Sequence, residues 1–248
     1  MRQKKEGSFL ETIKTILVAL LIAVVFRSFV YQPFNIPSES MVPTLLTGDY
    51  LFVSKFAYGY SRHSFPFSPP IFEGRIFARP VERGDVAVFK LPRDNRTDYI
   101  KRIIGLPGDR IQMVDGVLFI NGEPVKREPV PDFVSNDPNL TVRRARQYRE
   151  TLPNGVSYNV LDLYGMIDSD NTPVFHVPEG YYFALGDNRD NSADSRMSIS
   201  RGVGLVPAEN LVGRAEIISF STDGGARLWE VWKWFGAMRF DRFFKTIE

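Results

Sequence analysis

The strongest hydrophobic signal in the chain is a run at residues 15–26, which is apolar after its first threonine. At about 1.5 Å per residue, a helix of this run is about 18 Å long, short of the roughly 30 Å hydrocarbon core of a membrane. Lys14 and Arg27 flank the run, and their stems can lie in lipid while their charges reach the headgroups. Continuing through Tyr31 brings the helix to about 27 Å. The pattern predicts one membrane-spanning helix over residues 10–31, after a short N-terminal segment at residues 1–9.

Three interpretations of this segment compete: an uncleaved anchor, a signal peptide that is removed, and a buried core helix. Cleavage needs a small-x-small site, and residues 27–33 contain none. Only Arg27 lies close after the run, whereas several basic residues precede it: Arg2, Lys4, Lys5 and Lys14. We therefore favour the anchor, and the positive-inside rule places the N-terminus in the cytoplasm and the remaining chain outside.

From Pro33 onward, short apolar segments are separated by Gly, Pro and Asn-Gly turns, which is typical of a mainly β protein. The best core strands are predicted at residues 50–56, 85–91, 98–105 and 181–185. Asp115-Gly116 and Asn121-Gly122 bracket residues 117–120, and such dipeptides favour tight hairpin turns. Residues 117–120 are therefore predicted to lie in a tight meander.

The central part of the chain is predicted to be an insertion. Residues 126–150 are polar and contain Pro129, Pro131 and Pro138, so we expect a peripheral excursion there. This excursion lies inside a larger insertion at residues 111–177. We expect a second, inserted domain there, which divides the main domain into residues 32–110 and 178–226.

Two aromatic segments have two interpretations each. In residues 61–80, large apolar residues alternate with prolines, and the segment either packs on the body or dips its aromatics into the membrane interface. The tail at residues 227–248 mixes aromatic and basic residues and contains all three tryptophans. This amphipathic tail either lies in a membrane interface or caps the domain.

Composition excludes several classes of function. The 248-residue chain is 44% hydrophobic and 24% charged, which is typical of a folded protein. Its net charge of +2 is too small to indicate nucleic acid as the main partner. The chain has no cysteine, which excludes thiolate catalysis, disulfides and thiolate metal sites.

Histidine and metal chemistry are poorly supported. The two histidines, His63 and His176, lack the H-E-x-x-H spacing of a metal site, and no G-x-S-x-G elbow occurs. The acidic run at residues 186–194 suggests calcium, but Arg189 and Ser198 fall where an EF-hand loop needs ligands. We predict no metal and no cofactor.

Serine and lysine remain as candidate catalytic groups. Ser38 and Ser40 directly follow the predicted anchor, in a segment stiffened by Pro37 and Pro43. A lysine base must be neutral, and burial in apolar surroundings favours that form. Strand alternation places Lys101 on one face with Tyr99 and Ile103, but Lys55 and Lys90 pass the same test. The alternation pattern leaves all three lysines open.

Five sequence blocks in order, PSESMVPTL, GDYLFVSKFAYG, RGDVAVFK, DYIKRIIGLPGD and GDNRDNSADSR, are similar to those of bacterial type I signal peptidases. The resemblance implies a β-sheet or barrel catalytic core with an inserted smaller β-rich domain, preceded by one transmembrane helix. The chain departs from some relatives in showing one apparent span and not two.

The resemblance also assigns roles to residues that match the family's blocks. It implies that Ser40 is the nucleophile and Lys101 the general base, with the Ser38 hydroxyl and the Ser40 backbone N–H forming the oxyanion hole. Ser192 matches a serine that orients the lysine, and Asp194 and Arg196 match a supporting ion pair. The implied substrate pockets are lined by Phe34, Ile36, Pro37, Met41, Leu45, Tyr99 and Ile100. Glu39 lies at a variable position, and we expect it to face solvent.

The implied function is removal of N-terminal signal peptides from exported precursors, after small-x-small sites. The expected partners are these precursors, at the exit of the export machinery, and membrane lipid. The expected location is the bacterial inner membrane, with the catalytic domain on the outer, periplasmic face. Two rival interpretations are a self-cleaving Ser/Lys protease of the repressor type, which would carry a DNA-binding segment in place of an anchor, and a tethered β scaffold that binds exported chains without cutting them.

Overall fold

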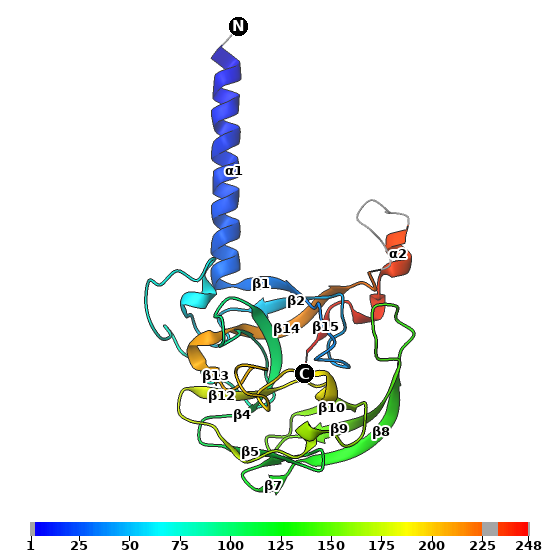
Figure 1. Ribbon diagram of the computed structural model, residues 1–248. Helices are drawn as coiled ribbons and strands as arrows, with labels where there is room; N and C mark the ends of the chain where they lie inside the picture. Colours follow the sequence, from blue (N-terminus) through cyan, green and yellow to red (C-terminus); the bar gives the residue numbers. More distant parts are fainter. Residues whose placement is uncertain (1–2, 225–232, 248) are drawn as a thin grey trace.

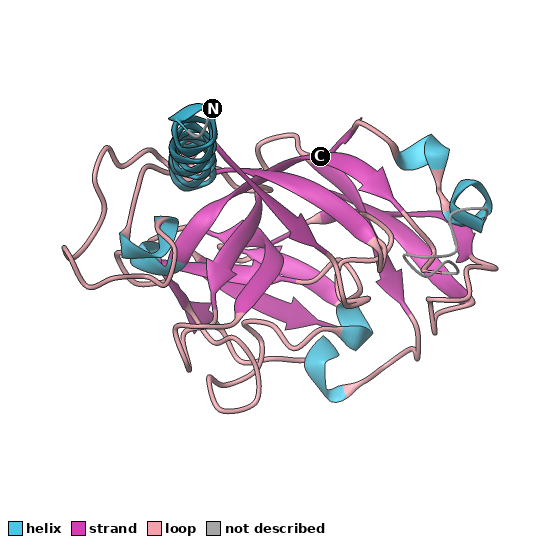
Figure 2. Ribbon diagram, turned by 90° about the horizontal axis from the view of Figure 1, so that it is seen from above, coloured by secondary structure: helices cyan, strands magenta, loops and turns pink. Residues whose placement is uncertain are grey.

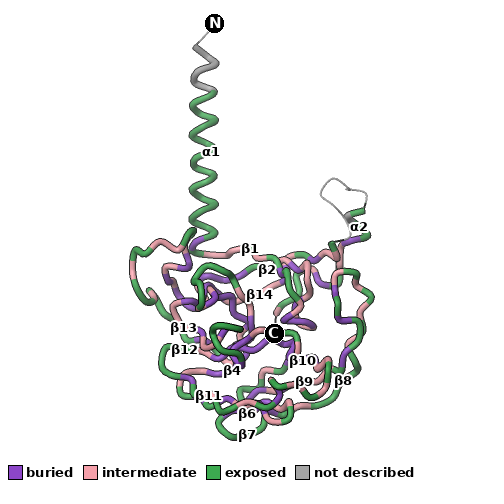
Figure 3. The backbone as a smooth tube through the Cα atoms, in the orientation of Figure 1, coloured by how far each residue is buried: buried purple, intermediate pink, exposed green. Residues whose placement is uncertain are grey.

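One long helix stands apart from a β-rich body in the computed structural model, which describes residues 3–224 and 233–247 (Figure 1). This helix, α1 (Gln3–Phe29), has an apolar stretch at Phe9–Phe29 that is exposed along nearly its whole length, as Figure 3 shows, and only Ser28 near its end is buried against the body. The interpretation as a buried core helix is therefore wrong. The predicted bounds also need correction, because Tyr31 already pairs with Ser54 in a sheet. The apolar helix reaches the length needed to cross a membrane through residues 9–14 at its start and not through residues 30–31 at its end.

The body is mostly β, and its largest sheet curls into an open half-barrel (Figure 2). The strand order is β1-β2-β14-β3-β4-β12-β13, with β15 paired to β14. The bounds of these strands are β1 (Tyr31–Asn35), β2 (Asp49–Ser54), β3 (Val86–Lys90), β4 (Asp98–Gly105), β12 (Tyr181–Leu185), β13 (Val206–Pro207), β14 (Leu211–Ser221) and β15 (Lys245–Thr246). The four predicted core strands are confirmed as β2, β3, β4 and β12.

Residues 110–176 form two further sheets, whose strands pair with each other and not with the large sheet. One has the order β11-β5-β6-β7, with β5 (Arg110–Val114), β6 (Val117–Ile120), β7 (Glu123–Pro124) and β11 (Phe175–His176). The predicted meander is confirmed, because both turn dipeptides have the positive φ that tight hairpins need. The other sheet has the order β10-β9-β8, with β8 (Lys126–Val134), β9 (Arg144–Thr151) and β10 (Ser157–Asp162).

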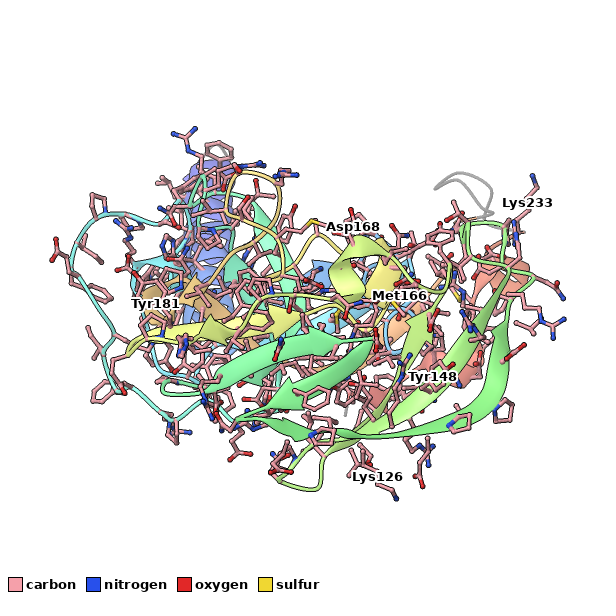
Figure 4. All side chains as sticks on the ribbon, turned by 60° about the horizontal axis from the view of Figure 1, so that its bottom comes forward. Lys126, Tyr148, Met166, Asp168, Tyr181 and Lys233 are labelled. Carbon is pink, nitrogen blue, oxygen red and sulfur yellow. The ribbon has the colours of Figure 1, made fainter. Side chains whose placement is uncertain are left out.

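The polar excursion predicted at residues 126–150 is thus largely two strands. Pro129 and Pro131 lie in β8, an edge strand, where a residue without an N–H is tolerated. Viewed from the side of the inserted residues, Lys126 of this strand extends into solvent (Figure 4). The sequence shows no apolar alternation here because no position of β8 is fully buried.

A shared core joins the inserted residues to the large sheet. Ile104 and Phe183 of the large sheet lie in one buried cluster with Ile111, Leu118 and Val160 of the two smaller sheets. The inserted residues therefore pack against β4 and β12 of the large sheet. The division into two domains stays a prediction.

Short helical turns complete the body: η1 (Arg62–Ser64), η2 (Asp168–Asp170), η3 (Arg189–Asn191), η4 (Ala208–Asn210), α2 (Trp234–Ala237) and η6 (Phe240–Arg242). In the described part of the C-terminal tail, β15 pairs with β14, and Arg242 is buried against Asp49. This part caps the large sheet, while Trp229 and Trp232 lie outside the described residues. Contact of the tail with lipid stays a prediction.

Candidate active site

Ser40 lies in the segment between β1 and β2, which folds over the edge of the large sheet. Ile36, Met41 and Leu45 of this segment are buried in one core cluster and fix its course. The Ile36 amide donates to the Asp49 carbonyl, and the Gly48 amide donates back to Ile36. The side chain of Ser40 is thereby held at the edge of the core, with only 8% of the residue exposed.

Lys101 approaches Ser40 from β4. Its Nζ lies 2.6 Å from Ser40 Oγ and 2.9 Å from the Ile100 carbonyl oxygen. The predicted shared face is present, because Nζ lies 5.5 Å from the centre of the Tyr99 ring. Burial lowers the pKa of Lys101 from 10.5 to about 8, although attraction to Asp194 and Asp187 acts in the opposite direction. A substantial neutral fraction therefore exists near neutral pH.

The other two candidate lysines are engaged elsewhere. Lys55 Nζ donates to Gln32 Oε1 at 3.0 Å. Lys90 Nζ lies 2.8 Å from Asp98 Oδ1 and donates to the Arg96 carbonyl. Of the three lysines that strand alternation left open, Lys101 is the one that the fold brings to Ser40.

The two other predicted serines are arranged differently. Ser38 Oγ lies 3.4 Å from Ser40 Oγ, on the exposed side of the segment. Ser192 Oγ is buried and has no hydrogen-bond partner, so the expected contact with Lys101 is not present in this structure. It lies against Gly186, where an added Cβ would come within 2.2 Å of Ser192 Oγ and 2.5 Å of the Ser40 carbonyl oxygen. Gly186 was not identified from the sequence, where it reads only as the start of an acidic loop.

Asp194 and Arg196 form the ion pair that the family blocks imply. Arg196 donates twice to the Asp194 carboxylate, at 3.0 Å each, and both side chains are buried. The Gly186 amide also donates to this carboxylate. Burial alone would raise the pKa of Asp194, but Arg196 and these hydrogen bonds lower it. The pair thus fixes the loop that carries Ser192.

A second buried ion pair lies beside the lysine and was missed in the sequence. Arg102, next to Lys101, donates to both carboxylate oxygens of Asp187, at 2.9 and 2.8 Å. Thr44 Oγ1 donates to the same carboxylate at 2.5 Å. This group joins β4, the loop after β12 and the segment that carries Ser40. Strand alternation gives only a weak indication of this ion pair, because all it shows is that Arg102 falls on the face of β4 opposite Lys101.

A cavity of about 370 Å³ opens beside Ser40 and Lys101. Five of the predicted substrate-binding residues line it: Phe34, Ile36, Pro37, Tyr99 and Ile100. Met41 and Leu45 do not line it but lie in the core, at 1% and 0% exposure. Val88, which pairs with Ile100 across β3 and β4, also lines the cavity and could have been found from strand register.

Glu39 does not face solvent as expected. Its carboxylate accepts hydrogen bonds from Thr141 N at 2.5 Å, Thr141 Oγ1 at 2.8 Å and Val142 N at 3.3 Å. Its carbonyl accepts from Asn188 Nδ2, and the next carbonyl, of Ser40, accepts from Asn188 N. The prediction failed because the partners lie in the turn between β8 and β9, far along the chain.

The acidic loop at residues 186–194 uses its carboxylates internally. Asp187 and Asp194 pair with arginines, and Asp190 accepts from the Leu163 and Tyr164 amides. Within residues 3–224 and 233–247, no group of three or more His, Cys, Asp or Glu side chains is placed to hold a metal ion. His63 is buried in η1, and His176 is exposed on β11.

Comparison with known proteins places the chain in a family. The model of the family described as signal peptidase, peptidase S26, matches residues 9–220. A signal peptidase I of Rickettsia typhi is 42% identical, over 92% of this chain and 90% of its own length. One of Rickettsia conorii is 46% identical, over 82% of this chain and 76% of its own. A crystal structure of a signal peptidase I from Enterococcus faecalis is 28% identical and covers 55% of this chain and 97% of its own, with a TM-score of 0.32. The chain therefore belongs to the signal peptidase family, peptidase S26.

Proposed function

We propose that this signal peptidase cleaves precursors with Ser40 as nucleophile and Lys101 as general base, while anchored in the membrane by α1. The observation that carries the proposal is the 2.6 Å contact between Lys101 Nζ and Ser40 Oγ in a buried site. With a pKa of about 8, roughly a quarter of the Lys101 side chains are neutral at pH 7.5. A neutral amine at this distance is positioned to accept the serine proton.

The reaction then follows from serine and amine chemistry. Lys101 accepts the proton as Ser40 Oγ attacks the scissile carbonyl, and the resulting lysine ammonium gives that proton to the leaving amine. The C-terminal part of the precursor is thereby released, and the signal peptide stays bound to Ser40 as an acyl-enzyme. Lys101 next accepts a proton from the water that attacks the ester, and the resulting ammonium returns that proton to Ser40 Oγ as the signal peptide is freed.

The oxyanion of each tetrahedral intermediate needs hydrogen-bond donors. We assign this role to the Ser38 hydroxyl and the Ser40 backbone N–H, one donor of this kind being worth about 3 kcal/mol. The exposed position of Ser38, 3.4 Å from Ser40 Oγ, supports the assignment. Ser192 is assigned an orienting role, which a rotation of its unpartnered hydroxyl would allow.

Specificity for small side chains is proposed from the walls of the catalytic cavity. Ile36, Val88 and Ile100 are apolar and line the space next to Ser40. Such walls favour short apolar side chains at the last residue before the cleavage site and at the residue two positions before that one. We accordingly propose cleavage after small-x-small sequences.

The proposed location follows from α1 and its flanking charges. The apolar stretch Phe9–Phe29 is long enough to cross a membrane, and it is exposed except at its end, where Ser28 is buried. The excess of basic residues before this stretch supports a cytoplasmic N-terminus. Only the short strand β1 and a few further residues separate Ser40 from the end of α1. The site therefore lies near the outer face of the membrane, where exported precursors emerge from the export machinery.

The proposal is tested with the full chain in detergent and a purified secretory precursor. Wild-type protein is expected to give one shortened product whose new N-terminus follows a small-x-small sequence. Ser40→Ala and Lys101→Ala are expected to give none, while Lys126→Ala, a lysine on exposed β8, cleaves normally. Substantial cleavage by Lys101→Ala would contradict the assignment of the base, and binding without any cleavage would favour a scaffold.

A further inference from the structure

A second cavity, of about 380 Å³, lies where α1 meets the body. Its walls include Arg27 in the last turn of α1, Gln32 of β1 and the segment from His63 to Ser68. It shares Asp98 with the catalytic cavity but contains neither Ser38, Ser40 nor Lys101. The proposed reaction gives this cavity no role.

The charge of the cavity is strongly unbalanced. Arg27, Lys90 and Arg96 line it, against one carboxylate, Asp98, which pairs with Lys90 at 2.8 Å. The side chains of Arg27 and Arg96 make no ion pair or hydrogen bond with any residue in the described part of the chain. Two guanidinium groups are thus available for an anion, and arginine binds phosphate with two parallel hydrogen bonds.

Neighbouring groups add to the positive field and to the donors. Lys55 is buried behind the wall and donates to Gln32 Oε1, so the Gln32 amide presents its NH₂ group as a further donor. Burial lowers the pKa of Lys55 to about 7, with repulsion from Lys90 and Arg27 adding to the effect against attraction by Asp98. A bound anion would relieve this repulsion.

The histidine in the wall has a defined tautomer. Arg62 Nε donates to His63 Nε2, so the ring proton lies on Nδ1 and is donated to Ser68 Oγ at 3.0 Å. The Ser68 hydroxyl accepts this bond and keeps its own proton as a donor. Burial and the nearby Arg62 lower the pKa of His63 to about 4, which keeps this arrangement at neutral pH.

The height of the cavity along α1 indicates the source of the anion. The apolar stretch ends at Phe29, two residues after Arg27, where hydrocarbon gives way to headgroups if α1 spans the membrane. The Phe65 ring packs on the Phe29 ring at 5.4 Å, and the next aromatic, Phe67, is fully exposed beside them. Exposed aromatic residues are typical of this depth. An acidic segment of a precursor has no such reason to meet the cavity.

We propose that this cavity binds the phosphodiester group of an anionic membrane phospholipid, with Arg27 and Arg96 as its principal ligands and the acyl chains along the end of α1. The proposal rests on the proposed function only in taking α1 as the anchor. Binding is measured without substrate, so an error in the catalytic assignment would not affect it.

The test measures the unfolding temperature of the full chain in a neutral detergent. Dihexanoyl phosphatidylglycerol is added and compared with dihexanoyl phosphatidylcholine, inorganic phosphate and a glutamate-rich peptide. Because a ligand that binds the folded state stabilises it, the phosphatidylglycerol is expected to raise the unfolding temperature in a saturable, salt-sensitive manner. Arg96→Gln and Arg27→Gln are each expected to raise the phosphatidylglycerol concentration that gives half of this effect at least about tenfold. Arg149→Gln, at an exposed position of β9, is the matched control and keeps the effect.

The other outcomes overturn the proposal. An equal response of wild type and both variants would mean that phosphatidylglycerol binds elsewhere. An equal response to inorganic phosphate would identify a free-anion site, and an equal response to phosphatidylcholine would remove the role of net charge. A response to the acidic peptide alone would assign the cavity to the precursor.

Discussion

The Glu39 carboxylate and the Thr141 backbone amide are joined by a hydrogen bond of 2.5 Å across 102 positions of sequence. Through this bond the residue before Ser40 is fixed to the turn between β8 and β9. Apolar contacts run in parallel, because Val42 lies in one buried cluster with Leu140 and Val142. The inserted strands therefore take part in positioning the nucleophile segment.

Glu39→Gln is expected to lower kcat several-fold with little change in KM. A glutamine offers one acceptor oxygen where the carboxylate offers two, so at least one of three hydrogen bonds is lost. Because Glu39 does not line the catalytic cavity, substrate binding is expected to change little. Steady-state kinetics with a precursor peptide measure both constants, and Glu128→Gln on β8 is the control. A rise in KM at unchanged kcat would contradict a positioning role.

The rate of cleavage is expected to fall about tenfold per pH unit below about pH 8. Burial lowers the pKa of Lys101 to about 8, and the amine must be neutral to accept the Ser40 proton. Acidification protonates it, so activity is lost as pH falls through that value. The measurement is kcat/KM from pH 5.5 to 9. A rate that does not vary between pH 6 and 9 would be incompatible with a lysine base.

Lys55→Met is expected to remove part of the pH dependence of stability while leaving the cleavage profile in place. Burial lowers the pKa of Lys55 to about 7, below the usual 10.5 that holds in the unfolded chain. Between these values the unfolded chain binds more protons, so stability rises with pH. From pH 6 to pH 9 this residue contributes a rise of about 2.5 kcal/mol, which the methionine variant lacks.

Urea unfolding of the full chain in detergent at the two pH values gives the comparison. Lys126→Met, at an exposed position, serves as control and is expected to behave as wild type. If Lys55→Met and wild type differ by the same amount at pH 6 and pH 9, Lys55 does not titrate in this range. If the variant also loses the acid limb of cleavage, Lys55 and not Lys101 is the base.

The contrast between Lys101 and Glu39 shows how far the sequence leads. Alternation places Lys101 on an apolar face, and the strand at Asp98–Gly105 has the predicted bounds. Local pattern cannot separate Lys101 from Lys55 and Lys90, because all three fall in predicted strands beside apolar residues. The pairing of β3, β4 and β14 decides which lysine reaches Ser40, and family resemblance supplied that information before the structure did.

Contacts between polar residues far apart in the chain could not be predicted from the sequence, for a different reason. Glu39 meets Thr141, and Arg102 meets Asp187 across 85 positions, and neither partner carries a periodic signal. A charged residue in a loop is usually solvated, so solvent was the natural expectation for Glu39. The strand β8 was missed because an edge strand with prolines and exposed side chains lacks apolar alternation. Its neighbour β9 is the central strand of that sheet, but it is mostly polar and lacks the alternation as well.

Gly186→Ala is expected to lower kcat by about a hundredfold or more and stability by about 1 to 3 kcal/mol. The added Cβ would come within 2.2 Å of Ser192 Oγ and 2.5 Å of the Ser40 carbonyl oxygen, so both sides of the site must shift. Gly236→Ala, where nothing lies within 4 Å of the added carbon, is the matched control. Kinetics together with thermal unfolding separate the two effects. An active Gly186→Ala enzyme would show that Ser40 and Ser192 tolerate displacement.

Arg102→Met is expected to destabilise the protein by about 3 to 5 kcal/mol, because it leaves the Asp187 carboxylate buried without its cation. The double variant Arg102→Met, Asp187→Leu is expected to recover most of that loss, since an uncharged pair of similar volume has no buried charge to compensate. Its acid limb of cleavage should also move to lower pH, because Asp187 is one of the two carboxylates that raise the pKa of Lys101. Urea unfolding and the pH profile of kcat/KM are the measurements. A double variant as unstable as the single one would mean that the Thr44 hydroxyl and Gly84 carbonyl contacts, and not the charge pair, stabilise this part of the site.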